Sequence, residues 1–301
     1  MALFIFTVKR MKAIHSIPLF CACALLLLAA CDKNMSLPSY IYVDSVSVST
    51  DYATQGTASA NVTDVWVTVN GKNLGVYELP ATVPVLASGD CKVQLQAGIK
   101  KDGLSALRPV YPFYTSDIRQ MELKAKRCDT IRPSFTYMPT AVFLFKEDFE
   151  DAGIKFSAVD SGIGMQKTAE SGLLFSYPHE SNHYSGYIAL GPEDTYFEVK
   201  TNVSMKKQLT YTFLEMNYNT TEDMEVGIYY HYNGRAVQTP LCGIYRTGSR
   251  GNSTWRKIYV NLTEAVNANS YASTYEVYIK SVKAVSDSAV YLFDNIKIVN
   301  M

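Results

Sequence analysis

The sequence has no excess of charge of either sign. Its 301 residues include 28 lysine and arginine residues against 28 aspartate and glutamate residues. A chain without net charge has no long-range field that would draw it to nucleic acid or to an anionic membrane surface. We therefore expect no nucleic-acid partner.

Cysteine is scarce in the part of the chain that is expected to fold. Of six cysteines, only Cys91, Cys128 and Cys242 follow residue 31. An odd number cannot be fully paired, and no two of them form the CxxC spacing of a zinc or redox site. A Cys91–Cys128 disulfide is permitted outside the cytoplasm, but unpaired buried thiols are equally common. Both alternatives stay open.

Long apolar runs are also absent, with one exception at residues 17–30. This run is short for a membrane span of about 20 residues, but it is long enough for the apolar region of a signal peptide. A single transmembrane helix is the alternative. The run ends in Leu-Ala-Ala-Cys at Cys31, and Met11-Lys12 would open a signal peptide with a basic start.

This ending resembles a bacterial lipobox, in which the signal peptide is cut before a cysteine that is then lipidated. The resemblance implies that translation starts at Met11, that residues 1–30 are removed as the signal peptide, and that acyl chains such as palmitate are attached to Cys31. Residues 31–38 would form a lipidated tether. The expected location is the cell envelope, anchored in the outer membrane and facing the exterior.

Aromatic and β-branched residues are plentiful. The chain has 22 tyrosines and 13 phenylalanines, with many valines, threonines and isoleucines, and such side chains favour strands. After cleavage about 270 residues remain, which suits two domains of ordinary size. We expect an all-β protein with two domains.

Residues 39–130 have the alternation of a small antiparallel β-sandwich, with Asn70-Gly71 as its strongest hairpin signal. The run 67–72, with Leu79-Pro80-Ala81 and Gly89, resembles surface-protein modules that carry a V-x-V-D-G hairpin on an immunoglobulin-like scaffold. Asn70 replaces the usual aspartate. The resemblance implies an immunoglobulin-like β-sandwich that acts as a spacer or binding platform.

A second, larger domain is expected over residues 141–301. It follows a proline-containing linker at 131–140, in which apolar residues do not repeat with the period of a strand or a helix. Its strands and the lack of a convincing helix predict a jelly-roll β-sandwich. After the first strand at 141–145, the predicted strands are 173–177, 187–190, 196–203, 209–218, 224–232, 241–246, 255–262, 275–282 and 289–299.

Three segments of this domain resemble the jelly-roll carbohydrate-binding modules and related surface lipoproteins of gut-type Bacteroidetes. They are residues 147–150 on the first strand, 255–262, and 291–296 on the last strand. The resemblance implies glycan binding and one structural calcium, held by first-strand acids and a last-strand aspartate. Calcium prefers hard oxygen ligands. The predicted metal ligands are Asp148, Glu150 and Asp294, and solvated strand ends are the alternative.

Glycan contacts are expected from side chains on the solvent face of the strands, because aromatic rings stack on sugars and polar neighbours bind hydroxyls. Val226 and Ile228 share one face of a strand, which leaves Tyr229 and His231 on the other. Tyr278 lies likewise opposite apolar neighbours. We predict these three as ligand-binding residues, with an ordinary tyrosine-rich surface as the alternative.

Residues His179-Glu180-Ser181-Asn182-His183 match the H-E-x-x-H motif of zinc metallopeptidases. The motif works on a helix, where both histidines reach one zinc and the glutamate activates water. Pro178 before it and Gly186 after it, between two predicted strands, leave room for two helical turns at most. We therefore predict a chance match in a loop, and no catalytic residues.

Together these features predict a non-enzymatic, membrane-anchored surface lipoprotein that binds polysaccharide or glycan through its C-terminal jelly roll. The alternative from another class is a structural or assembly component of the cell envelope without a ligand. A zinc metallopeptidase is a further alternative.

Overall fold

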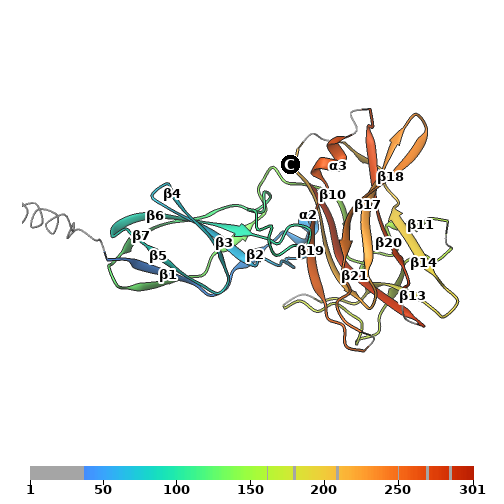
Figure 1. Ribbon diagram of the computed structural model, residues 1–301, viewed down its shortest axis with the longest axis horizontal. Helices are drawn as coiled ribbons and strands as arrows, with labels where there is room; N and C mark the ends of the chain where they lie inside the picture. Colours follow the sequence, from blue (N-terminus) through green and yellow to red (C-terminus); the bar gives the residue numbers. More distant parts are fainter. Residues whose placement is uncertain are drawn as a thin grey trace, which may run out of the picture.

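The computed structural model describes residues 37–160, 162–178, 181–207, 210–249, 251–268, 271–284 and 287–301. The predicted signal peptide, residues 1–30, and the predicted lipidation site Cys31 lie outside the described residues. Within them the chain forms two β-sandwiches of unequal size (Figure 1), so the predicted all-β fold class is confirmed. None of the described helices is both long enough and apolar enough to span a bilayer.

The smaller sandwich has the sheets β5-β1-β8 and β4-β3-β6-β7, and β2 pairs with β9. Its alternating valines, isoleucines and leucines point inward and form the core. Its immunoglobulin-like character stays a prediction. The elements are β1 (Ser39–Val43), β2 (Ser47–Ser49), α2 (Tyr52–Gln55), β3 (Asp64–Val69), β4 (Lys72–Glu78), β5 (Ala81–Val85), β6 (Gly89–Gly98), β7 (Asp117–Leu123), β8 (Cys128–Ile131) and β9 (Ser134–Thr136).

The predicted hairpin at Asn70-Gly71 is confirmed. It joins β3 to β4, Val69 pairs with Lys72, and φ is 50° at Asn70 and 79° at Gly71. Positive φ at both central residues is what a two-residue hairpin turn requires, and asparagine followed by glycine adopts it at least cost. Cys91, Cys128 and Cys242 are free thiols.

The larger sandwich has a first sheet, β12-β13-β21-β16-β19 with β10 beside β21, and a second sheet, β11-β14-β20-β17-β18 with β15 beside β20. The elements are β10 (Val142–Glu147), β11 (Phe156–Ala158), β12 (Gln166–Thr168), β13 (Ser185–Leu190), β14 (Tyr196–Thr201), β15 (Met205–Lys206), β16 (Thr212–Thr220), β17 (Met224–Tyr232), β18 (Arg235–Ile244), β19 (Arg256–Asn261), α3 (Thr263–Ala268), β20 (Thr274–Val282) and β21 (Ala289–Asn300).

Two local expectations are wrong. Residues 173–177, predicted as a strand, form a loop, and residues 263–268 form the short helix α3 where no helix was expected. The loop contains Phe175, which is 8% exposed, because two aromatic neighbours pack on it rather than a strand partner. Short apolar runs favour strands only where a neighbouring strand can pair with them.

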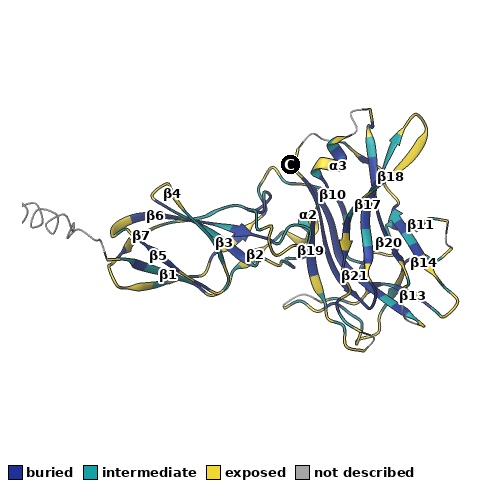
Figure 2. Cartoon of the chain, in the orientation of Figure 1, coloured by how far each residue is buried: buried dark blue, intermediate teal, exposed yellow. Residues whose placement is uncertain are grey.

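The smaller sandwich packs on the outer face of the first sheet. Aromatic residues of the smaller domain meet Phe213, Tyr259 and Val299 in a shared core. The first sheet is therefore covered on both faces, and every residue of β16 is buried. The outer face of the second sheet lies on the side away from the smaller sandwich (Figure 1). Strands β14 and β18 of this sheet have half-buried and exposed residues (Figure 2).

The segment predicted as a linker, residues 131–140, belongs to this interface. It contains β9 and buries Phe135 and Tyr137 in the shared core. The proline residues of this segment indicated a linker. The aromatic side chains between them are buried instead, because removing their apolar surface from water stabilises the folded state. The two sandwiches are thus joined by packed structure.

Candidate functional site

The outer face of the second sheet, here called the distal face, is set by the alternation of its strands. On β14, Phe197 and Val199 point to the core, and on β17, Val226 and Ile228 do so. The residues between them must then point outward, because successive side chains on a strand alternate. The distal face consists of Tyr196, Glu198, Lys200, Glu225, Gly227, Tyr229, His231, Gln238, Glu276, Tyr278, Lys280 and Val282.

Tyrosine hydroxyls and carboxylates are bonded to one another across this face. The hydroxyl of Tyr278 donates to Glu225 Oε1 at 2.5 Å, and that of Tyr229 donates to Glu198. Burial, followed by these hydrogen bonds and negative charges, raises the pKa of both tyrosines well above its usual value. Both hydroxyls therefore stay protonated and fix the carboxylates in place.

The remaining charges on the distal face are paired as well. Lys280 Nζ lies 3.0 Å from Glu225 Oε1, and Lys200 Nζ lies 2.7 Å from Glu276 Oε2. His231 Nε2 lies 3.2 Å from the same Glu276 oxygen. Burial raises the pKa of Glu276, but the hydrogen bond and charge of Lys200 outweigh it and lower the pKa overall. The face is a network of oriented donors and acceptors, in which three carboxylates meet two lysines and one histidine.

The structure brings the predicted ligand-binding residues together. The ring centroids of Tyr229 and Tyr278 are 5.3 Å apart, and His231 and Tyr229 share the outward side of β17. Tyr229 and His231 are half-buried, but Tyr278 is fully buried. The expectation that Tyr278 is an exposed aromatic is therefore wrong, because its ring fills the space above Gly227, where a Cβ would lie 2.4 Å from Tyr278 Cζ.

Sequence reasoning missed Tyr196 on this face. It is 37% exposed and pairs with Val282 of β20, which is 68% exposed. The signal was present in the strand itself, since Tyr196 alternates with the buried Phe197 and Val199. The charged residues Glu198 and Lys200, which share this side of β14 with Tyr196, give that side the pattern of an ordinary solvated strand face.

The predicted calcium ligands lie near the domain junction, and two of them are not on the first strand as expected. β10 ends at Glu147, so Asp148 and Glu150 follow the strand, which corrects the expected placement. Asp148 Oδ2 accepts from Tyr52 Oη at 2.8 Å, and Glu150 accepts from the backbone N–H groups of His183 and Tyr184. Each carboxylate is thus satisfied by protein donors.

Asp294 is fully buried on β21. Its Oδ2 accepts from Ser185 Oγ at 2.6 Å and from Asn182 Nδ2 at 3.0 Å, and its Oδ1 accepts from the N–H of Asn295. Burial raises the pKa of Asp294 to about 7 against these hydrogen bonds. Within the described ranges, no three histidine, cysteine, aspartate or glutamate side chains are grouped closely enough to hold a metal ion. Calcium binding stays a prediction.

The H-E-x-x-H segment lies partly outside the described residues, since 179 and 180 are not described. Residues 181–184 form no helix, and His183 Nδ1 lies 3.0 Å from Glu150 Oε2. The described half of the motif therefore lacks the helical geometry that would turn position 183 toward position 179.

A scan against protein-family models gave no match, and neither did a comparison with curated proteins. Solved structures similar to this chain include carbohydrate-binding modules of the β-sandwich superfamily, at 11% identity and a TM-score of 0.38, with 88% of this chain and 99% of that chain covered. A family 11 carbohydrate-binding module from Clostridium thermocellum, solved with a mixed-linked tetrasaccharide, has 12% identity and a TM-score of 0.35 over 52% of this chain and 94% of that chain.

The N-terminal modules of a Clostridium thermocellum endo-1,4-β-D-xylanase, solved with xylohexaose, are also similar, at 9% identity and a TM-score of 0.39. The alignment covers 53% of this chain and only 28% of the xylanase chain.

Proposed function

We propose that this chain is a non-enzymatic, lipid-anchored surface protein that binds a glycan chain on the distal face. The observation that carries the proposal is the pair of partly exposed tyrosines, Tyr196 and Tyr229, on a face whose other polar groups are fixed by mutual hydrogen bonds. Tyrosine rings stack on sugars, and preplaced polar groups bind hydroxyls without the cost of ordering them on binding.

The spacing of the two tyrosines favours an extended ligand. Tyr196 pairs with Val282 of β20, and Tyr229 pairs with Glu276 of the same strand. These positions are six residues apart, which corresponds to about 20 Å at a rise of about 3.3 Å per residue. The side chain of Tyr229 reaches toward Glu198, two residues from Tyr196, so the rings are closer than these backbone positions. We expect a ligand that contacts both rings to be a chain of sugars rather than a single unit.

The position of the face also suits an anchored protein. The expected lipid is at Cys31, before β1 of the smaller sandwich, and the distal face lies on the far side of the larger sandwich (Figure 1). A chain anchored at its N-terminus would present this face away from the membrane, with the smaller sandwich as a spacer.

The absence of catalysis on the distal face is proposed from the state of its carboxylates. A glycosidase needs one carboxyl group with a raised pKa that donates a proton to the leaving group. On the distal face, the pKa of Glu276 is lowered, and Glu225 and Glu198 accept hydrogen bonds from tyrosines. None of these arrangements provides a proton donor.

A glycan array tests the proposal, with the chain from residue 32 onward applied to plant, host and microbial polysaccharides. We expect binding to at least one polysaccharide that Tyr196→Ala and Tyr229→Ala both weaken. The control is Tyr245→Ala, which removes a 76%-exposed tyrosine outside this face. Silence across all polysaccharides would overturn the proposal and leave the structural component of the envelope as the better account.

A further inference from the structure

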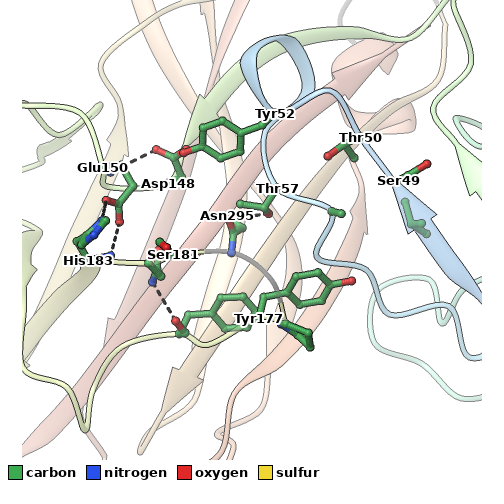
Figure 3. Close-up of a pocket in the computed structure, with 15 residues that line it drawn as sticks. Ser49, Thr50, Tyr52, Thr57, Asp148, Glu150, Tyr177, Ser181, His183 and Asn295 are labelled. Atoms are coloured by element: carbon green, nitrogen blue, oxygen red, sulfur yellow. Dashed lines mark hydrogen bonds and ion pairs between the residues drawn. The ribbon is translucent and has the colours of Figure 1, made fainter.

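A trough follows the junction of the two sandwiches, apart from the distal face. It consists of two cavities of about 720 Å³ and 610 Å³ that adjoin at Phe175 and Tyr177. Pockets for small ligands have volumes of about 300–1,000 Å³. One wall of the first cavity carries Thr50 and Tyr52 of the smaller domain, and the other belongs to the larger domain (Figure 3). The trough therefore exists only because the two domains are joined.

Three aromatic side chains lie where the cavities adjoin. The rings of Phe175 and Tyr177 stack at 6.3 Å with an interplanar angle of 14°, and Trp255 meets Phe175 edge-on at 5.3 Å. Phe175 is buried, whereas Tyr177 and Trp255 are half-buried and line the trough. The trough thus has aromatic surfaces of the kind that stack on the apolar face of a sugar ring.

The polar walls of the trough carry mainly hydroxyl and amide groups. These belong to Ser49, Thr50, Thr57, Asn182 and Asn295 in the first cavity and to Ser59, Asn61 and Asn217 in the second. Such groups donate and accept hydrogen bonds without requiring a charged ligand. They match the hydroxyls of a neutral saccharide.

The charged side chains that line the trough have partners in the protein, although Arg256 in the second cavity bonds to the hydroxyl of Tyr218 rather than to an acid. Glu150 faces His183, and Asp148 accepts from Tyr52 (Figure 3). In the second cavity, Lys257 Nζ lies 3.0 Å from Glu215 and Lys100 Nζ lies 3.3 Å from Glu78. Arg256 is thus the one basic lining residue, among those described, without an acidic partner. A ligand with several charges would have to displace the other pairs, so a neutral ligand is favoured.

The aromatic surface is held in place from below. Asn182 Nδ2 donates to the carbonyl oxygen of Phe175 and to Asp294 Oδ2, both at 3.0 Å, and the N–H of Phe175 donates to Ser185 Oγ at 3.0 Å. These bonds tie the loop to β13 and β21. A loop that is ordered before binding loses less entropy when the ligand arrives.

A peptide is a poorer fit, because the edge of β19 that borders the second cavity is already occupied. Asn61 Nδ2 donates to the carbonyl oxygen of Lys257 at 3.2 Å, and the N–H of Asp102 donates to that of Tyr259 at 2.8 Å. Asp102 Oδ1 also accepts from the N–H of Asn261. Addition of a peptide strand needs free backbone groups along an edge, and these are taken.

We propose that this trough is a second binding site, for a neutral saccharide, in which Tyr177 and Trp255 are the stacking surfaces. The site is independent of the distal face, since it shares no residue with it. Asn182 is a positioning residue that holds the Phe175 loop.

Intrinsic fluorescence gives a readout that only this site should move. The chain has two tryptophans, and Trp66 lies on β3 of the smaller sandwich with its indole N–H bonded to Arg108 O. In Trp66→Phe, from residue 32 onward, Trp255 is the sole reporter. We expect cellohexaose, xylohexaose or mannohexaose to change its emission saturably.

Matched variants in the same background complete the test. Tyr177→Ala should weaken the fluorescence-detected affinity about tenfold or more, equivalent to about 1.4 kcal/mol, whereas Tyr245→Ala should leave it unchanged. Circular dichroism and melting curves confirm that each variant is folded. Tyr229→Ala should weaken binding at the distal face and spare the Trp255 response, which separates this proposal from the previous one.

Three outcomes would overturn the second site. One is the lack of any saturable response to the three saccharides. Another is an undiminished response in folded Tyr177→Ala, and the last is a response to a mixture of unstructured peptides but to no saccharide.

Discussion

Glu215 joins the two sandwiches through a single buried carboxylate. Its Oε1 accepts from the hydroxyls of Tyr111 and Tyr137 of the smaller domain, each at 2.6 Å, and its Oε2 lies 3.0 Å from Lys257 Nζ. Burial alone would raise the pKa of Glu215, but the charges of Lys257 and Lys297 and the two hydroxyls lower it overall. The ionised form is therefore the one that the folded protein stabilises.

Acid should weaken this junction. The pKa of Glu215 is lower in the folded than in the unfolded chain, so its ionised carboxylate stabilises the fold fully at pH values above the pKa of the unfolded chain. This stabilisation is lost as the pH falls through the pKa of the folded chain. Glu215→Gln should lower the free energy of unfolding by about 3–5 kcal/mol at pH 7, since it leaves Lys257 buried without its counter-charge. The same substitution should also make the free energy of unfolding depend less on pH at acidic pH.

Urea unfolding between pH 3 and 7 measures both effects. Glu122→Gln is the control, because Glu122 pairs with Lys124 at an exposed position and such pairs contribute about 0–1 kcal/mol. Equal losses in the two variants would contradict the role assigned to Glu215.

Tyr229 should act through its ring more than through its hydroxyl. Tyr229→Ala should lower glycan affinity about tenfold, equivalent to about 1.4 kcal/mol. Tyr229→Phe, which keeps the ring but loses the bond to Glu198, should lower it less. Isothermal titration with the best polysaccharide from the array compares them, and an equal loss in both variants would argue against stacking.

At the scale of elements, the distal face depends on how closely β17, β18 and β20 approach. A Cβ on Gly227 would lie 2.4 Å from Thr239 O and 2.4 Å from Tyr278 Cζ, whereas one on Gly243 would meet nothing within 4 Å. Both glycines lie in the same pair of strands, β17 and β18. They form a matched pair for testing the packing.

Gly227→Ala should therefore destabilise the chain by about 1–3 kcal/mol, the usual cost of overpacking, and displace Tyr278. Gly243→Ala should change stability far less. Thermal melting compares the two variants. Equal melting temperatures for both would contradict the close packing that we infer around Gly227.

The acids near the end of β10 and on β21 provide the test of calcium. If calcium exchanges with their present donors, it should raise the melting temperature by mass action, because it binds only the folded state. Asp294→Ala should abolish the rise. Melting curves that are identical with calcium and with chelator would refute the prediction.

At the scale of the whole molecule, the lipid at Cys31 is expected to decide where the chain is found. Acyl chains contribute about 0.8 kcal/mol per buried methylene, and stable anchoring needs more than one chain. The Cys31→Ala variant should therefore be found either in the soluble fraction or as a precursor that retains its signal peptide. Palmitate labelling measures this, and unchanged labelling of the mutant would refute the lipid anchor.

Much of the architecture was readable from sequence because it depends on local pattern. The alternation of residues 224–232 predicted the bounds and the outward side of β17, and Asn70-Gly71 predicted a turn that needs only two residues. The same alternation separated Tyr278 from Tyr275, Val277 and Ile279, which the structure places in the core. These features depend on a period of two or on one backbone preference, and both are properties of neighbours in the chain.

The tertiary structure alone decided which of these surfaces remain open. Docking of the smaller sandwich covers the outer face of the first sheet with Phe135, Tyr137 and their neighbours. Residues 131–140, which the sequence predicts to be a linker, therefore form part of the interface. Packing within the larger domain likewise brings Tyr177 and Trp255 to one cavity, although they are 78 positions apart in the sequence. Contacts of such separation depend on which faces find complementary partners when the sheets pack, and no local period encodes that choice.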